Sequence, residues 1–144
     1  MAHRVPAEPA TLPAATRGPG LVLLGLPGLW CAQRFYAPLA ESLDGTGHWV
    51  GLEWRGHGGH RAPRGEWGLR EAAAEALALL DALAIPRALV VGHSLGGMAA
   101  LHLALDHPGR VAGLVLMGAS PAAETPERRS RLEAAGIALR LAGP

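Results

Sequence analysis

The chain has 144 residues, of which 49% are apolar and 17% charged, and this supplies the core of one globular domain and excludes a disordered or fibrous protein. The formal net charge is +1, and no basic stripe is present that would neutralise a run of phosphates, so nucleic acid is not expected as a partner. All thirteen cations are arginines, which excludes a lysine Schiff base and the lysine of a nucleotide phosphate loop.

The single cysteine and the first residues bear on where the protein works. Cys31 has no partner for an internal disulfide, so we expect a reducing compartment, the cytoplasm. Residues 1–19 contain four prolines and no continuous apolar run, which favours a flexible leader over a signal peptide. The apolar runs farther along are too short to cross a bilayer, so no membrane association is expected.

From residue 20 onward, short apolar runs alternate with stretches of helical character. In chain order the pattern predicts a strand at 21–25, a helix at 33–43, a strand at 48–53, a helix at 69–83, a strand at 88–92, a helix at 95–105, a strand at 111–117 and a helix from about 125 toward 141. Such alternation is typical of parallel strands joined by helical crossovers. We therefore predict an α/β fold, a parallel sheet with helices on both faces, in which the continuously apolar strand 21–25 is central.

The most informative segment is Gly92-His93-Ser94-Leu95-Gly96-Gly97, between a predicted strand and a predicted helix. This is the context of a Gly-x-Ser-x-Gly nucleophile elbow, a sharp turn that exposes its serine at the carboxyl end of a strand. The turn strains the backbone of Ser94, and side chains in place of the flanking glycines would collide with the neighbouring strand and helix. The amide of Leu95, at the start of the helix, then points toward an oxygen bonded to Ser94 and forms half an oxyanion hole.

Other interpretations of this segment are weaker. A strand-to-helix turn without function is the plain alternative, because a bare Gly-x-Ser-x-Gly also occurs by chance. A dinucleotide-binding fingerprint requires glycine where Ser94 stands, and a nucleotide phosphate loop requires lysine, so neither fits.

Three further segments accompany the elbow in chain order. They are Leu23-Leu24-Gly25-Leu26-Pro27-Gly28, Glu53-Trp54-Arg55-Gly56-His57-Gly58 and His107-Pro108-Gly109-Arg110-Val111. These resemble the oxyanion loop, the Asp-x-Arg-Gly-His-Gly loop and the His-Pro-x-Arg-Val strand entry of the α/β-hydrolase superfamily, whose amino-terminal half residues 20–123 resemble. Within it, the chain is most similar to small bacterial ester and enol-lactone hydrolases and to cofactor-free haloperoxidase-like members.

The resemblance implies a serine hydrolase that transfers the acyl group of a small carboxylic ester or lactone to water, with no cofactor and no metal. It makes Ser94 the nucleophile and the backbone amides of Leu26 and Leu95 the oxyanion donors. Residues 20–123 are then the amino-terminal part of the hydrolase core, truncated to about four strands. Residues 124–144 are a helix at the start of a missing lid.

Two positions depart from the family pattern. Leu24 stands where the family usually has a histidine that organises the oxyanion loop through hydrogen bonds, and a leucine side chain cannot form such bonds to position the Leu26 amide. His60 stands where a serine commonly follows the Arg-Gly-His-Gly run.

The base and the acid of a catalytic triad have no counterpart in these residues. A serine hydroxyl needs a histidine to remove its proton, and that imidazole needs a carboxylate. The resemblance places both later in the chain, but 118–120 reads Gly-Ala-Ser and no histidine follows His107. The alternative function is therefore a non-catalytic fragment or binding module. The expected partners are the small substrate, a second copy of the chain or a complementing carboxyl-terminal half.

Other residues offer substitutes that we consider weaker. His57 and His60 lie on the same sheet edge as Ser94, so either is an alternative base, although the resemblance gives His57 a structural role. A metal site from Cys31 with these two histidines lacks the paired spacing of zinc sites. The histidines at 93, 102 and 107 are interpreted as structural or solvated.

Three aromatic residues follow the expected oxyanion loop, namely Trp30, Phe35 and Tyr36. They are candidates for lining an acyl pocket, and core packing is the more common role of such residues.

Overall fold

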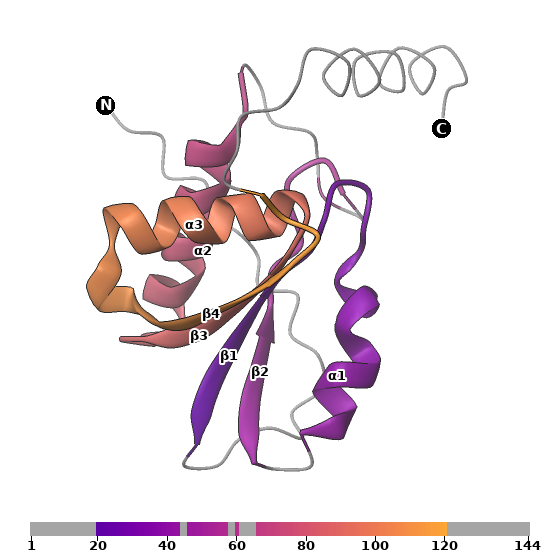
Figure 1. Cartoon of the computed structure of the whole chain (residues 1–144), viewed down its shortest axis with the longest axis vertical. Helices are drawn as coiled ribbons and strands as arrows, with labels where there is room; N and C mark the ends of the chain where they lie inside the picture. The colour runs from indigo at the N-terminus through magenta and orange to yellow at the C-terminus, as the bar shows by residue number, and fades with distance from the viewer. Residues whose placement is uncertain (1–19, 44–45, 58–59, 61–65, 121–144) are drawn as a thin grey trace.

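The computed structural model of the chain describes residues 20–43, 46–57, 60 and 66–120 (Figure 1). The expected leader at 1–19, and the helix expected from about residue 125 at the start of a lid, lie outside the described residues. None of the helices within those ranges has the length and apolar character needed to span a membrane.

The sheet has four strands, all parallel, in the order β2-β1-β3-β4. They are β1 (Leu21–Leu26), β2 (Gly47–Gly51), β3 (Ala88–His93) and β4 (Val111–Met117). The predicted α/β class and the inner position of β1 are confirmed. The second strand begins and ends slightly earlier than the predicted 48–53.

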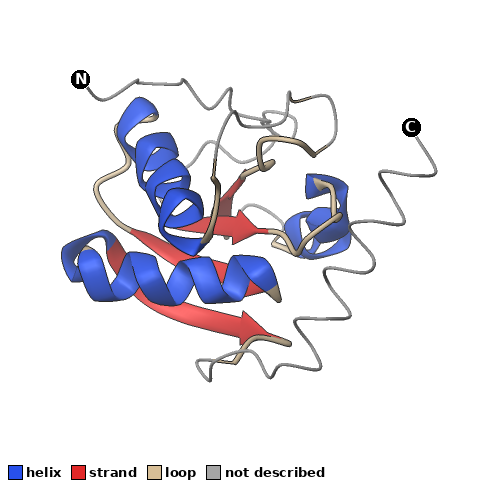
Figure 2. Ribbon diagram, turned by 90° about the horizontal axis from the view of Figure 1, so that it is seen from above, coloured by secondary structure: helices blue, strands red, loops and turns tan. Residues whose placement is uncertain are grey.

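Helices cover both faces of the sheet, as predicted (Figure 2). On one face lie α2 (Leu69–Ala82) and α3 (Leu95–Asp106), which pack against each other. On the other face lie a 3-10 turn, η1 (Gln33–Tyr36), and the short helix α1 (Ala37–Ser42). A second 3-10 turn, η2 (Pro108–Arg110), leads from α3 into β4.

The predicted helix at 33–43 is therefore split into a 3-10 turn and a short α-helix. Pro38 has no backbone N–H, and its ring clashes with the carbonyl four residues earlier, so an α-helix passing through this point is disfavoured. Proline is tolerated in a first helical turn, and α1 begins one residue before it.

The apolar residues of the strands alternate between two cores. Leu24, Leu26 and Val90 face α2 and α3, whereas Leu23 and Val91 pack with Trp49 and Tyr36 beneath α1. Because the inner strands β1 and β3 are buried on both faces along most of their length, their sequences are continuously apolar. The carboxyl ends of the strands meet at one edge of the sheet, where the loops after β1, β2 and β3 gather.

Candidate active site

Ser94 occupies the predicted turn between β3 and α3. Its backbone has φ 50° and ψ −115°, a region that a residue with a side chain rarely adopts. Two hydrogen bonds hold it there: the Ser94 N–H donates to the Met117 carbonyl at 2.8 Å, and the Ser94 carbonyl accepts from the Met98 N–H at 3.1 Å. The strained turn at the carboxyl end of β3 is confirmed.

The glycines on either side are required by close approach of the backbone. A Cβ at Gly92 would lie 2.6 Å from the Gly96 carbonyl oxygen and 2.6 Å from the Gly97 Cα, within the start of α3. A Cβ at Gly96 would overlap the Leu26 carbonyl and lie 2.7 Å from that of Pro27. The turn is therefore packed directly onto the chain that follows β1, without side chains between them.

The Ser94 side chain lies beside the loop after β1. A Cβ built on Gly28 would be 3.4 Å from the Ser94 Cβ. The Ser94 hydroxyl makes no capping hydrogen bond to α3, and Leu95 is the first residue of that helix. The Leu95 N–H is one of the first N–H groups of the helix, which have no acceptor within the helix, and it lies at the positive end of the helix dipole.

Leu26, the other expected oxyanion donor, is fully buried at the end of β1. The Gly25 carbonyl accepts from the Leu52 N–H at 3.0 Å, so Gly25 turns toward β2. Successive residues of a strand turn their backbone polar groups to opposite neighbours, so Leu26 turns its amide and carbonyl toward β3, where it pairs with Gly92. The Leu26 amide therefore faces β3, and its role as an oxyanion donor stays a prediction.

Two buried aromatic residues hold the chain after β1. The Tyr36 hydroxyl donates to the Leu26 carbonyl at 2.8 Å, and the Trp54 Nε1–H donates to the Pro27 carbonyl at 2.7 Å. Leu24, in the place of the family histidine, is fully buried in the core and has no polar atom in its side chain. The hydrogen bonds to this loop come instead from residues 36 and 54, which sequence reasoning did not identify.

The pKa of the Tyr36 phenol is shifted by its surroundings. Burial raises its pKa above the ordinary value, and a hydrogen bond from the backbone of His93 opposes part of that rise. Its ring centroid lies 5.0 Å from that of Trp49 and 5.1 Å from that of Phe35.

The two candidate bases after β2 have other partners. The Nε2 atom of His57 accepts a hydrogen bond from the Trp30 N–H at 2.8 Å, and its Nδ1 atom lies 3.4 Å from the Arg55 carbonyl. The Nε2 atom of His60 lies 4.0 Å from a Glu53 carboxylate oxygen. The lone pair that a base would use is thus engaged in His57, which supports the structural role expected for that residue.

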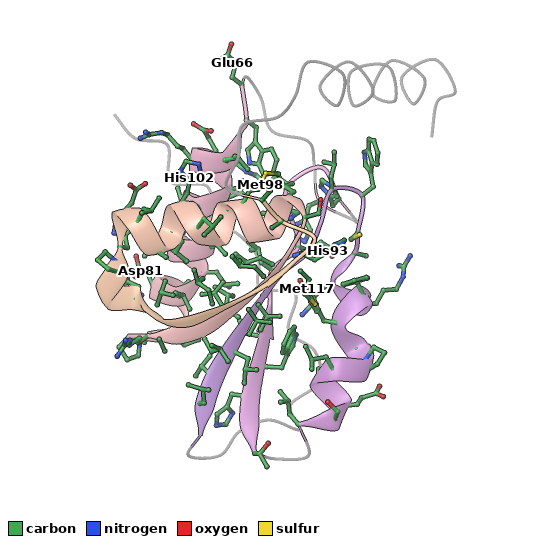
Figure 3. All side chains as sticks on the ribbon, in the orientation of Figure 1. Glu66, Asp81, His93, Met98, His102 and Met117 are labelled. Carbon is green, nitrogen blue, oxygen red and sulfur yellow. The ribbon has the colours of Figure 1, made fainter. Side chains whose placement is uncertain are left out.

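The other histidines lie on different elements. His93 is at the carboxyl end of β3, whereas His102 lies farther along α3 (Figure 3). The imidazole of His93 stacks on Phe35 with ring centroids 4.9 Å apart, and its Nδ1 atom is buried without a hydrogen-bond partner among the described residues. Within those residues no three potential metal ligands come together.

The three aromatic residues after β1 differ in their environment. Tyr36 is buried in the core, as expected for most such residues. Trp30 and Phe35 are instead 55% and 48% exposed, and Trp30 has a φ of 61°. Core packing is therefore the wrong interpretation for Trp30 and Phe35, which are both exposed, and the Phe35 ring stacks on His93 of the elbow.

A buried carboxylate on α2 anchors the loop after β2. Glu75 of α2 is only 8% exposed. It forms an ion pair with Arg55 at the start of the loop and accepts from the Trp67 Nε1–H at 2.9 Å at its end. The signal that sequence analysis overlooked is the arginine of the Arg-Gly-His-Gly segment, which needs an acidic partner when it is half-buried.

Comparison with known proteins is consistent with this geometry. The family model for the alpha/beta hydrolase fold matches residues 21–134. RutD of Variovorax paradoxus (strain S110), provisionally named a carbamate hydrolase, is 41% identical over 96 residues, which cover 64% of this chain and 35% of that protein. The 2-heptyl-3-hydroxy-4-quinolone dioxygenase AqdC2 of Rhodococcus erythropolis is 40% identical over 86 residues, covering 60% and 31%.

Among solved structures, the enol-lactonase from Burkholderia xenovorans LB400 superposes with a TM-score of 0.72 and 27% identity, covering 76% of this chain and 42% of that one. The chain spans about a third of the length of these curated relatives.

Proposed function

The chain belongs to the alpha/beta hydrolase fold family, and on that premise we propose that it carries the nucleophile half of a serine hydrolase acting on a carboxylic ester or lactone. The observation that carries the proposal is the strained backbone of Ser94, at the carboxyl end of β3, with its Cβ beside the loop after β1. Strain of this kind persists only where the surrounding structure enforces it, and it concentrates at functional sites.

In the proposed reaction the Ser94 Oγ atom attacks the carbonyl carbon of the substrate. The carbonyl oxygen becomes an oxyanion, to which the backbone amides of Leu26 and Leu95 donate hydrogen bonds, with the positive end of the α3 dipole adding to the field. Loss of the alcohol leaves an acyl group on Ser94, which water then removes.

The hydroxyl needs a base, and a base needs a carboxylate to hold its tautomer. We assign neither role to His57, because its Nε2 atom already accepts the Trp30 N–H. We propose that a polypeptide segment outside these 144 residues supplies both groups. The competing function, a non-catalytic fragment or binding module, applies to the isolated chain in the absence of that segment.

The apolar rings near the elbow favour a substrate with an apolar part. The exposed ring of Phe35 stacks on His93 of the elbow, Trp30 is exposed in the loop after β1, and an exposed flat ring binds acyl chains or other rings by excluding water. The names of the relatives add further substrates that should be tested. These are lactones and carbamates, after the enol-lactonase and the RutD protein, and a 3-hydroxy-4-quinolone, after the dioxygenase. The single cysteine supports a cytoplasmic location.

The test is complementation. The chain is co-expressed with the carboxyl-terminal half of a related hydrolase, and hydrolysis of an activated ester is measured. We expect turnover that Ser94→Ala abolishes and that Ser42→Ala, which removes an exposed hydroxyl from α1, leaves unchanged. The chain alone should hydrolyse the ester little above buffer, because loss of the triad histidine costs about a millionfold in turnover, roughly 8 kcal/mol.

Two results would contradict the proposal in different ways. Turnover that survives Ser94→Ala would remove the serine mechanism. Robust turnover by the unaided chain, lost in Ser94→Ala, would show that a base lies within it, and His57→Ala and His60→Ala would then identify it.

A further inference from the structure

One hydroxyl contacts both segments that form the candidate site. We propose that Tyr36 is a positioning residue whose buried hydroxyl sets the separation between the loop after β1 and the elbow, and thereby the separation of the Leu26 amide from Ser94. The inference rests on the proposed function for its catalytic consequence. The structural part of the inference is tested independently of activity.

The contacts of the hydroxyl span both strands. Its proton is shared between the Leu26 carbonyl at 2.8 Å and the Val91 carbonyl at 3.3 Å, and its oxygen accepts a hydrogen bond from the backbone N–H of His93. Leu26 is the last residue of β1, and His93 immediately precedes Ser94. A single oxygen atom therefore contacts the end of each strand.

The register of the sheet explains why a hydroxyl fits there. Leu26 pairs with Gly92, and an ideal parallel ladder would join the Leu26 carbonyl to the His93 N–H. The Tyr36 hydroxyl contacts both of those groups. It therefore lies at the point where the ladder ends and the two chains diverge into the loop and the elbow.

The ring that carries this hydroxyl is held firmly. Tyr36 is 2% exposed, and its ring packs against Trp49 on one side and meets the Phe35 ring at 81° on another. Leu24 lies in the core on the other face of the sheet and has no polar side-chain atom. The hydroxyl of Tyr36 supplies the side-chain hydrogen bond to the Leu26 carbonyl.

Such positioning matters because an oxyanion donor must lie about 2.7–3.1 Å from the developing charge. A displacement of about 1 Å costs on the order of 100-fold in rate. Removal of the hydroxyl should therefore change kcat rather than substrate affinity.

The first experiment uses the 144-residue chain and needs no activity. Amide hydrogen exchange, followed by mass spectrometry, is compared between the wild type, Tyr36→Phe and the matched hydroxyl deletion Ser42→Ala. In Tyr36→Phe we expect peptides at the end of β3 to exchange about tenfold faster, because the His93 N–H loses one of its acceptors and the hydroxyl no longer joins the Leu26 and Val91 carbonyls. Peptides from α2 should stay within about twofold of the wild type, and Ser42→Ala should leave both regions unchanged.

Two outcomes would overturn the inference. Unchanged exchange at the end of β3 would mean that the hydroxyl does not hold the elbow. Equal acceleration in β3 and α2 would mean that the hydroxyl contributes only to global stability.

If the Phe variant does not fold, 3-fluorotyrosine replaces it. This analogue keeps the ring and alters the hydroxyl as a donor and acceptor, and it enters at this position alone because the chain has one tyrosine. Exchange at the end of β3 should then change while α2 does not, and no change would overturn the inference.

The second experiment uses the complemented enzyme. Tyr36→Phe should lower kcat about 10- to 100-fold with KM unchanged. A rise in KM alone, or no effect on kcat, would contradict the positioning role. If the wild-type complex is inactive, the proposed function fails, and the exchange result still decides whether Tyr36 holds the two segments together.

Discussion

At the scale of single residues, the site depends on backbone conformations that side chains disfavour. Ser94 and Trp30 both have positive φ angles, each at a cost of about 1–3 kcal/mol. Hydrogen bonds from distant segments hold both: the Met117 carbonyl accepts the Ser94 N–H, and the His57 imidazole accepts the Trp30 N–H. The strain at the candidate site is thus offset by contacts outside the turns themselves.

The buried phenol of Tyr36 makes the free energy of unfolding depend on pH in the alkaline range. Burial raises the pKa of its phenol, so above the ordinary value of 10.0 the unfolded chain releases a proton that the folded chain retains. The contribution of Tyr36 is therefore complete below about pH 10 and is lost as pH rises, by up to about 1.4 kcal/mol per pH unit.

Urea unfolding at about pH 8 and about pH 11 measures this loss, and Tyr36→Phe, which cannot titrate, should lose less stability than the wild type. Since the chain has one tyrosine, the ultraviolet absorbance of the phenolate reports this group alone. Titration of the folded protein at the ordinary value would show that the hydroxyl is not held as described.

At the scale of elements, the elbow is a direct contact between the start of α3 and the end of β1. No side chain separates the Gly96 Cα from the carbonyls of Leu26 and Pro27. The loops around it are tied in the same way to other elements, by Trp54 to Pro27 and by Glu75 to Arg55. The geometry of the site is therefore set by contacts between elements.

This contact makes Gly96 intolerant of a side chain. Gly96→Ala should lower the free energy of unfolding by about 1–3 kcal/mol or more, because the new methyl group must displace backbone. Gly109→Ala is the matched control, since a Cβ there would meet nothing within 4 Å. Urea denaturation of the two variants measures the difference, and equal stabilities would contradict the close packing of α3 on the end of β1.

At the scale of the whole molecule, β4 is an edge strand in the described sheet. It pairs with β3 on one side, and its residues Val115 and Leu116 are 42% and 39% exposed. An apolar edge of this kind is a template for pairing with another chain. We propose this edge as the place where an expected partner, a second copy or a complementing half, would pair.

We accordingly expect the isolated chain to self-associate at micromolar concentration. Val115→Lys should reduce the association, because a charge on an edge strand opposes pairing. Leu105→Lys is the control, as it replaces a 77% exposed apolar residue on α3 and should leave association unchanged. Sedimentation velocity measures both, and a compact wild-type monomer with a cooperative melt would exclude the edge as an association surface.

The local sequence pattern alone was sufficient to predict the strands, the longer helices and the elbow. The continuous apolar runs of β1 and β3 reflect burial on both faces, and a serine flanked by glycines between a strand and a helix permits few backbone paths. The one split element, at 33–43, contains its own cause in Pro38, which the prediction did not take into account.

Only the tertiary structure decided what each side chain near the elbow contacts. The Tyr36 hydroxyl donates a hydrogen bond to a carbonyl of β3 that is 55 residues away in the sequence. The Trp54 indole donates to a carbonyl 27 residues away, and the Nε2 atom of His57 accepts from the Trp30 N–H. The same packing buried Glu75 and left Phe35 exposed. Periodicity reports which face of an element is apolar, but hydrogen-bond partners depend on where separate elements meet, and the sheet order and register determine that.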